Sequence, residues 1–556
     1  MDFKRNIADV LKKVLKQEVV LEVPPNPELG DFAFPCFGLA KELKKNPIEI
    51  AKDLVKKIPK IKGIESIQAT GPYMNFFVDR KALAEETLAI VLKKQDSYGK
   101  GNYAKEKVMV EFSQANTHKA FHVGHVRGTS LGESISRILE FCGNKVLRVN
   151  YQGDTGMHVA KWLWCYLKYH KKEGLKNDEA WIAKIYVEAV KKLAENPESQ
   201  EEVNEINKKL ETKEDKELSE LWQKTRKLSL DSLEIIYKEL NTHFDQYFFE
   251  SHVEKRGKEI AKELVKKGIA EVDQGATIVN LEKHNLNVWV LLRKDGTVLY
   301  STKDLALAEK KFEEHEIDRA IYVVGNEQRL HIYQLFKTLE LMKFKQAKNC
   351  QYVPVCEVRL PEGKMSSRTG ENILYSDFKK ELVSHAAEEI KKREKLSAKE
   401  LEKRALAIAI AAFKYSMLKQ DTNKSIVFDK HEALRFEGDT GPYLLYSYAR
   451  ARSILEKAKY NVKKKFKVDE LDEKEKSLIL QLYAFPEIVL QAYNNLEPHI
   501  IANYANQLAQ AFNEFYHALQ VIGSEKEQFR LVLVDCFSQV LKNALYLLGI
   551  PIIERM

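Results

Sequence analysis

The chain has 556 residues, of which 44% are hydrophobic and 31% are charged, and its formal net charge is +9 at pH 7. This length is too great for one hydrophobic core, so we expect about three or four domains. The composition excludes a disordered chain, and the mild positive excess permits a nucleic-acid partner without establishing one.

The six cysteines are scattered, with no C-x-x-C pair and no nearby set of histidine ligands. A structural zinc site or a disulfide framework is therefore not expected, and a reducing compartment fits. We see no signal-peptide pattern and no run of the roughly 18 apolar residues that a membrane span needs. We therefore expect a cytoplasmic protein without a membrane partner and without a protein-bound metal.

Residues 1–100 are expected to form a small α/β domain. The apolar spacing at 7–15 predicts an amphipathic helix, and the apolar run at 19–23 predicts a strand. A loop rich in proline and glycine follows. Residues 74–78 then read as a short closing strand after a Gly-Pro-Tyr turn.

Residues 101–380 show the pattern of a nucleotide-binding domain. A strand at 108–112, a helix at 125–142 and a strand at 146–150 predict a parallel β-α-β unit. The charged stretch at about 170–250 predicts a solvated helical insertion. The domain then resumes, with strand patterns at 277–281, 288–292, 320–324 and 352–355.

Residues 381–556 show helical periodicity and no strand pattern, as at 405–418 and 505–519. They predict an α-helical bundle. The predicted fold class is α/β: a Rossmann-like parallel sheet with an insertion, a small N-terminal α/β domain, and a C-terminal all-α bundle.

The segment His122-Val123-Gly124-His125 stands where the first strand gives way to a helix. Its two histidines, three residues apart, would project on one side of the helix start. Free N–H groups and partial positive charge at that position suit a phosphate. Gly124 would let a flat base or ribose approach the backbone.

A second segment, Gly363-Lys364-Met365-Ser366-Ser367-Arg368, is a loop flanked by Gly370. Two cations separated by small hydroxyl residues can follow a pyrophosphate group, and the glycines would let the loop move. Taken alone, either segment could equally be a surface feature, a helix cap or a plain basic turn.

Together the two segments resemble the signatures of class I aminoacyl-tRNA synthetases. The run from Glu111 to Arg127 is similar to the E-F-S-S-P-N-x-x-K-x-x-H-x-G-H-x-R run of arginyl-tRNA synthetases. Departures are Gln114-Ala115 for the usual Ser-Pro and Thr155 for a common Trp, whose role stays open. Further segments that resemble this family are 150–154, 300–305, 324–331, 440–443 and 547–556, so the likeness spans every predicted domain.

The resemblance implies ATP-dependent ligation of L-arginine to its tRNA through an arginyl-adenylate, with His122, His125 and Lys364 as catalytic residues. It implies that arginine is bound by Glu111, Asn116, Tyr300, Asp304 and Gln328. It implies that ATP, as its magnesium complex, is bound by Ala115, Asn116, Thr117, His118, Lys119, Ala120, Phe121, His122, Val123, Gly124, His125, Lys364, Met365, Ser366, Ser367 and Arg368.

The residue types suit arginine. Its guanidinium is planar, permanently charged and rich in donors, so a selective pocket needs fixed carboxylates, and Glu111 and Asp304 provide two. Such a site rejects neutral analogues by roughly 10⁴-fold, which makes an editing domain less necessary. In the simpler alternatives, Asp304 caps a helix, Glu111 pairs with a local lysine, and Tyr300 and Gln328 are ordinary core-edge residues.

The resemblance also implies a monomer that binds tRNA with an arginine anticodon and needs it for arginine activation. The bundle would bind the anticodon through Tyr443, Tyr446, Arg450 and Arg452, with Tyr448 nearby, since aromatic and cationic side chains stack on splayed bases. The same tyrosines could instead be core. The N-terminal domain would hold the tRNA elbow, with Lys44, Lys45, Lys56 and Lys57 as candidates.

Two other functions are weighed. Another class I enzyme is one: the missing cysteine–zinc set argues against a cysteinyl enzyme, and the Glu111/Asp304 pair argues against a glutamyl enzyme. The other is an inactive paralogue that only binds RNA. The presence of His122, His125 and Lys364 opposes it, whereas unchanged turnover in Lys364→Ala would support it.

Overall fold

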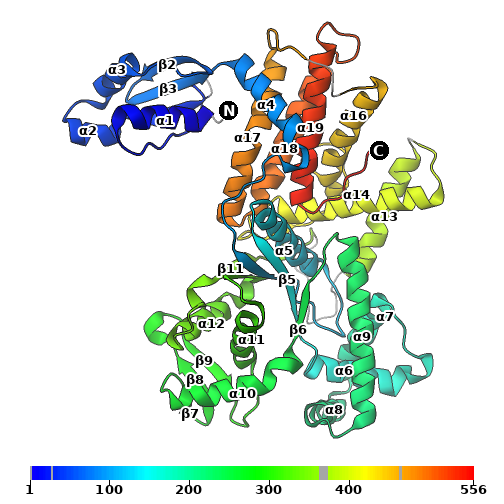
Figure 1. The fold of residues 1–556 in the computed structure, drawn as a ribbon. Helices are drawn as coiled ribbons and strands as arrows, with labels where there is room; N and C mark the ends of the chain where they lie inside the picture. The colour runs from blue at the N-terminus through cyan, green and yellow to red at the C-terminus, as the bar shows by residue number, and fades with distance from the viewer. Residues whose placement is uncertain are drawn as a thin grey trace. The chain divides into compact units, whose positions relative to one another are not determined.

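The computed structural model describes residues 3–24, 26, 29–361, 374–392, 394–461 and 466–555 (Figure 1). The chain divides into two compact units. The first comprises Met1–Tyr98, Ala451–Phe485 and Gln510–Val540, and the second comprises Gly99–Arg450, Pro486–Ala509 and Leu541–Met556. None of the helices in the described residues combines the length and apolar character that crossing a bilayer requires.

An antiparallel sheet in the first unit has the strand order β1 (Phe32–Pro35), β3 (Tyr73–Val78), β2 (Ile64–Thr70). The expected helix at 7–15 is present within α1, which buries one face. The helices in this part of the chain are α1 (Phe3–Leu15), α2 (Phe37–Leu43), α3 (Pro47–Lys57) and α4 (Arg80–Lys94).

The strand expected at 19–23 is wrong. Only Glu22 pairs there, in an isolated bridge to Ala33. Leu21 is buried, at 6% exposed, but Val20 and Val23 are 77% and 68% exposed. Hydrophobicity alone therefore misled the prediction, because one bridge and one buried side chain do not make a strand.

A five-stranded parallel sheet organises the second unit, in the order β11-β10-β4-β5-β6. Parallel strands all end at one edge of a sheet, which is where ligands bind in open α/β folds. Helix α5 (Val123–Phe141) follows the central strand β4. The strands are β4 (Lys107–Glu111), β5 (Lys145–Gln152), β6 (Gln246–Phe249), β10 (Arg319–Gly325) and β11 (Cys350–Val355).

Four long helices stand between β5 and β6, in the region where a helical insertion is expected (Figure 1). They bury a separate apolar cluster that contains Trp162, Trp181 and Ile185. The helices are α6 (Met157–Cys165), α7 (Glu179–Glu195), α8 (Gln200–Thr212) and α9 (Lys216–Glu239).

Two of the strands expected to resume the nucleotide-binding sheet belong elsewhere. These two strands are β8 (Ala276–Asn280) and β9 (Val288–Leu292). They form a separate antiparallel sheet together with β7 (Glu271–Asp273). Short loops join them, whereas a parallel pair needs a long crossover. Helices α10 (Glu250–Lys266), α11 (Tyr300–His315) and α12 (Arg329–Leu341) complete this part of the second unit.

The C-terminal third is helical, as predicted, except that β12 (Val358–Arg359) pairs with β13 (Ile426–Val427). A two-residue strand is too short to leave a pattern in the sequence. The helices are α13 (Tyr375–Lys391), α14 (Ala398–Leu418), α15 (Lys430–Ala433), α16 (Gly441–Lys457), α17 (Glu473–Asn495), α18 (Pro498–Ala518) and α19 (Glu527–Leu547).

Candidate active site

Glu111 is the last residue of β4 and is 5% exposed. Its Oε2 forms an ion pair with Lys311, a 1% exposed lysine from α11. The ammonium of Lys311 also lies 4.3 Å from the ring centroid of Tyr322. Glu111 therefore pairs with a lysine, but the alternative of a local lysine is wrong, because Lys311 comes from a distant part of the chain.

Asp304 lies one turn inside α11, which begins at Tyr300 after the N-cap Leu299. Asp304 is therefore not a helix cap, and that alternative is wrong. Its Oδ2 accepts a hydrogen bond from Nε2 of His331 at 2.6 Å. Nδ1 of His331 in turn lies 3.2 Å from the indole nitrogen of Trp289.

The Trp289 contact determines the tautomer of His331. An indole N–H can only donate, so Nδ1 of His331 must accept and carries no proton. The proton is therefore on Nε2, which donates it to Asp304. A neutral imidazole orients the carboxylate without cancelling its negative charge.

The hydroxyl of Tyr151, near the carboxyl end of β5, is buried and has no hydrogen-bond partner among the described residues. Burial raises the pKa of Tyr151 well above its ordinary value, and the carboxylates of Asp304, Glu250, Glu111 and Asp154 raise it further. Tyr151 thus lies in an acidic cluster with an unused hydroxyl, which suits a cationic ligand rich in donors.

Three of these four carboxylates are paired with cations. Glu111 pairs with Lys311, Glu250 with Lys303 at 2.9 Å, and Asp154 with Arg226 at 2.7 Å. Asp304 pairs only with the neutral His331. Among the carboxylates that surround Tyr151, Asp304 is thus the one whose charge is not compensated by a described side chain.

His122 is the N-cap of α5, and its ring stacks on that of His125 with centroids 3.8 Å apart. The two predicted histidines therefore lie together. Burial, and then Lys119, lowers the pKa of His122 to about 4. Burial, then His122 and Lys119, lowers the pKa of His125 well below its ordinary value. Both rings are neutral at pH 7 and would contact a phosphate as hydrogen-bond donors rather than as cations.

The loop between β4 and α5 has left-handed backbone at Ser113, Gln114 and His118, with φ of 76°, 48° and 61°. The side-chain oxygen of Asn116 accepts from the N–H of Gly153 at 3.1 Å. A Cβ at Gly153 would lie 2.6 Å from that oxygen, so a larger residue there would displace the Asn116 side chain. Asn116 is thus tied to the residue that follows β5, close to Tyr151 in the chain.

The remaining predicted arginine-site residues are more exposed. Tyr300, the first residue of α11, is 65% exposed, and Asp304 lies within electrostatic reach of it. Gln328 ends a 3-10 turn and is exposed. Lys364, Met365, Ser366, Ser367 and Arg368 lie outside the described residues.

The predicted anticodon residues fall on α16. The guanidinium of Arg450 lies 4.6 Å from the ring centroid of Tyr446, and its Nη2 donates to the Tyr446 hydroxyl at 3.0 Å. Tyr443 is partly buried and Tyr448 is 4% exposed, so Tyr448 is a core residue rather than a stacking platform. Arg452 lies in the first unit, within electrostatic reach of Asp535.

The sequence reasoning assigned no role to Lys311, His331, Trp289 or Tyr151. Lys311 follows Asp304 by seven residues, which places both on one face of a helix, so helical periodicity could have found it. His331 stands in a segment that matches the family. The Trp289 contact has no signal in the sequence, because it depends on how the β7–β9 sheet packs on α12.

Models of three known families match most of the chain. "tRNA synthetases class I (R), catalytic domain" matches residues 87–430, "DALR anticodon binding domain" matches 444–556, and "Arginyl tRNA synthetase N terminal domain" matches 1–78. The chain belongs to the arginyl-tRNA synthetases. Its predicted fold class and function are confirmed, and the cysteinyl and glutamyl alternatives are excluded.

Similar proteins support the same family. The chain is 39% identical to an arginine–tRNA ligase of Clostridium acetobutylicum and 37% identical to one of Clostridium perfringens, covering 100% of each chain. The solved structure of Thermus thermophilus arginyl-tRNA synthetase is 27% identical with a TM-score of 0.82, covering 100% of this chain and 99% of that chain. As an arginyl-tRNA synthetase, the chain ligates arginine to tRNA, and like other class I enzymes it uses ATP.

Proposed function

We propose that the guanidinium of arginine binds between Glu111 and Asp304, beside the hydroxyl of Tyr151. In support, one oxygen of each carboxylate is held by a described side chain: Oε2 of Glu111 by Lys311 and Oδ2 of Asp304 by His331. The other oxygen of each is left for the N–H groups of the substrate. Two fixed acceptors match a planar group with several donors.

The uncompensated charge of Asp304 carries this proposal. The other three carboxylates around Tyr151 are already paired with cations, so the pocket lacks about one positive charge. The Asp304 side chain is 17% exposed, an unpaired charge that is largely withdrawn from water is costly, and a guanidinium would supply the missing cation without leaving an excess. A neutral analogue such as citrulline would leave Asp304 uncompensated and would be rejected.

We expect the other substrate-binding residues at the same edge of the parallel sheet. Asn116 would hold the amino or carboxylate end of arginine, with Tyr300 and Gln328 alongside. His122 and His125 would donate hydrogen bonds to the phosphates of magnesium-bound ATP. The stretch Ala115–Phe121 and Gly124 would form the rest of this part of the ATP site. Lys364 would act with them, on the segment Lys364–Arg368.

The reaction has two steps. A carboxylate oxygen of arginine forms a bond to the α-phosphorus of ATP, the bond from that phosphorus to the bridging oxygen breaks, and pyrophosphate leaves. A ribose hydroxyl of the tRNA's terminal adenosine then attacks the arginyl carbonyl, and AMP leaves. The protein contributes chiefly by positioning the reactants and stabilising charge.

The partner would be a tRNA with an arginine anticodon. Residues 381–556 would read the anticodon through Tyr443, Tyr446, Arg450 and Arg452. Residues 1–100 would hold the tRNA elbow, and residues 101–380 would carry the chemistry. The enzyme would act as a cytoplasmic monomer, and arginine activation would require the tRNA.

Charging kinetics of Asp304→Asn test the arginine site. We expect the KM for arginine to rise about a hundredfold, since truncating one partner of a buried charge pair costs about 2–5 kcal/mol, while the KM for ATP is unchanged. The control is Glu313→Gln, which removes an exposed carboxylate from the same helix. An unchanged KM for arginine in Asp304→Asn would refute the proposed site.

A further inference from the structure

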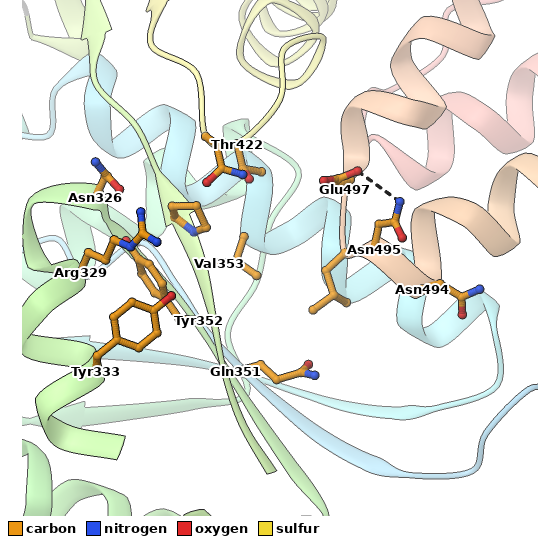
Figure 2. A pocket seen from close by; sticks show the side chains of 13 residues that line it. Asn326, Arg329, Tyr333, Gln351, Tyr352, Val353, Thr422, Asn494, Asn495 and Glu497 are labelled. Atoms are coloured by element: carbon orange, nitrogen blue, oxygen red, sulfur yellow. Dashed lines mark hydrogen bonds between the residues drawn. The ribbon is translucent and has the colours of Figure 1, made fainter. Parts of the chain in front are cut away.

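A polar pocket with a volume of about 410 Å³ lies beside the edge strand β11, within the second unit (Figure 2). One wall comes from the turn after β10, the start of α12 and β11 itself. The other comes from residues 422–423 and from the turn between α17 and α18. The pocket thus draws on both the region matched by the catalytic model and the region matched by the anticodon-binding model.

Neutral amides dominate the lining. The side chains of Asn326 and Asn494 make no hydrogen bond to any described residue, and Figure 2 shows them on opposite sides of the pocket. Asn495 donates to Glu497 at 3.4 Å. An amide both donates and accepts, so it can pair with a base edge or a ribose hydroxyl.

An aromatic and a cation complete the wall formed by α12. Tyr333 is 39% exposed, and the guanidinium of Arg329 lies 5.6 Å from its ring centroid. Tyr352 packs edge-on against Tyr333 with centroids 5.9 Å apart, which fixes that ring. Tyrosine and arginine planes are the surfaces on which single nucleotides stack.

The lining residues together limit the chemical class of ligand that this pocket can bind. One arginine cannot hold a free polyphosphate, and Glu497 opposes a second anion in the same pocket. The exposed amides are poor partners for an apolar protein surface or a lipid. A ring on which to stack, several amides and a single cation together match one nucleotide with one phosphate.

We propose that this pocket binds one nucleotide of the bound tRNA, at a position other than its 3′ end and its anticodon. The inference rests on tRNA being the partner. The 3′ end must reach the pocket around Asp304 and the anticodon must reach the helical domain, so a pocket built from both regions faces a nucleotide between those two ends. A nucleotide could occupy this pocket only when the tRNA contacts the catalytic region and the helical domain at the same time.

The triple variant Asn326→Ala, Asn494→Ala, Tyr333→Ala tests this proposal. We expect the dissociation constant for tRNA to rise about tenfold or more, while the KM values for arginine and ATP at saturating tRNA stay unchanged. Hydroxyl-radical footprinting should lose protection at one nucleotide outside the anticodon and the 3′ end. Asn204→Ala, an exposed amide on α8, is the matched control, and thermal unfolding confirms that each variant is folded.

Two results would overturn the proposal. One is an unchanged affinity for tRNA and an unchanged footprint. The other is unchanged tRNA affinity together with loss of a second bound equivalent of free AMP, which would make the pocket a site for free nucleotides. Failure of the proposed function is separate, because it would appear as wild-type enzyme that does not charge tRNA with arginine.

Discussion

At the residue scale, the two carboxylates that we propose to bind arginine are held in different ways. Lys311 fixes Glu111 and also cancels its charge, whereas His331 fixes Asp304 and leaves its charge intact. Glu111 therefore contributes a fixed hydrogen-bond acceptor to the site. Asp304 contributes both a fixed acceptor and a net negative charge. Preorganised groups of this kind add selectivity because little is reorganised when the substrate binds.

His331→Leu and His331→Gln separate the hydrogen bond from the bulk of the ring. Leucine removes the donor to Asp304, and loss of a hydrogen bond to a charged group costs about 1.5–3 kcal/mol, so we expect the KM for arginine to rise about tenfold or more. Glutamine keeps a neutral N–H donor and should stay much closer to wild type. Equal KM values for the two variants in charging assays would show that His331 does not position Asp304.

His118 predicts a pH dependence of stability. Burial, then His158 and Arg226, lowers its pKa to about 3, and both ring nitrogens contact threonine hydroxyls, of Thr117 at 3.0 Å and Thr225 at 2.9 Å. Below about pH 6.5 the unfolded chain takes up a proton that the folded ring refuses. The stabilisation is therefore complete above that pH and is lost as the pH falls towards 3.

Urea unfolding at pH 7.5 and 5.5 measures this effect. His118 should account for about 1.4 kcal/mol of lost stability at pH 5.5, and His118→Gln should lose correspondingly less between the two pH values. The exposed His431→Gln is the control and should behave like wild type. A His118→Gln variant with the wild-type pH dependence would contradict the assignment.

At the element scale, close packing of α5 on β4 sets the position of the two signature histidines. A Cβ at Gly132 would lie 2.0 Å from Cγ of Phe112, a buried ring that packs on Phe244 with centroids 4.7 Å apart. At Gly128, one turn earlier in α5, an added Cβ would have no neighbouring atom within 4 Å outside the backbone of its own helix. Gly128 and Gly132, on the same helix, therefore make a matched pair for substitution.

Gly132→Ala should destabilise the protein by about 1–3 kcal/mol and reduce charging, because Phe112 must move and α5 carries His122 and His125. Gly128→Ala should be neutral or stabilising by up to about 1 kcal/mol, since alanine favours a helix. Thermal unfolding and charging rates of both variants provide the measurement. Equal stability of the two would show that α5 can shift away from β4 without cost.

Periodicity predicted the elements that have a regular buried face. β4, α5, β5, β10 and β11 all lie where the sequence indicated, because their apolar residues recur at the spacing of the element. Pairing was harder: the pattern of β8 and β9 does not say which sheet they join. The run at 19–23 failed because burial is a property of neighbours rather than of the run itself.

At the scale of the whole molecule, resemblance to the family predicted the residues of the candidate site. The structure shows which of their charges are paired. The segments around Glu111, His122 and Asp304 were found by their motifs. The compensation of three carboxylates and the tautomer of His331 depend on contacts between distant segments, which no local pattern encodes. The proposed anticodon residues and the proposed elbow-binding domain remain predictions.

The most direct test of the central claim is ATP–pyrophosphate exchange by the full-length enzyme, with and without arginine and with and without tRNA bearing an arginine anticodon. We predict exchange only when arginine and the tRNA are both present, and no exchange when citrulline or lysine replaces arginine. Exchange with arginine alone would contradict only the proposed tRNA requirement. No exchange with arginine and tRNA together would contradict the account and favour a protein that only binds RNA.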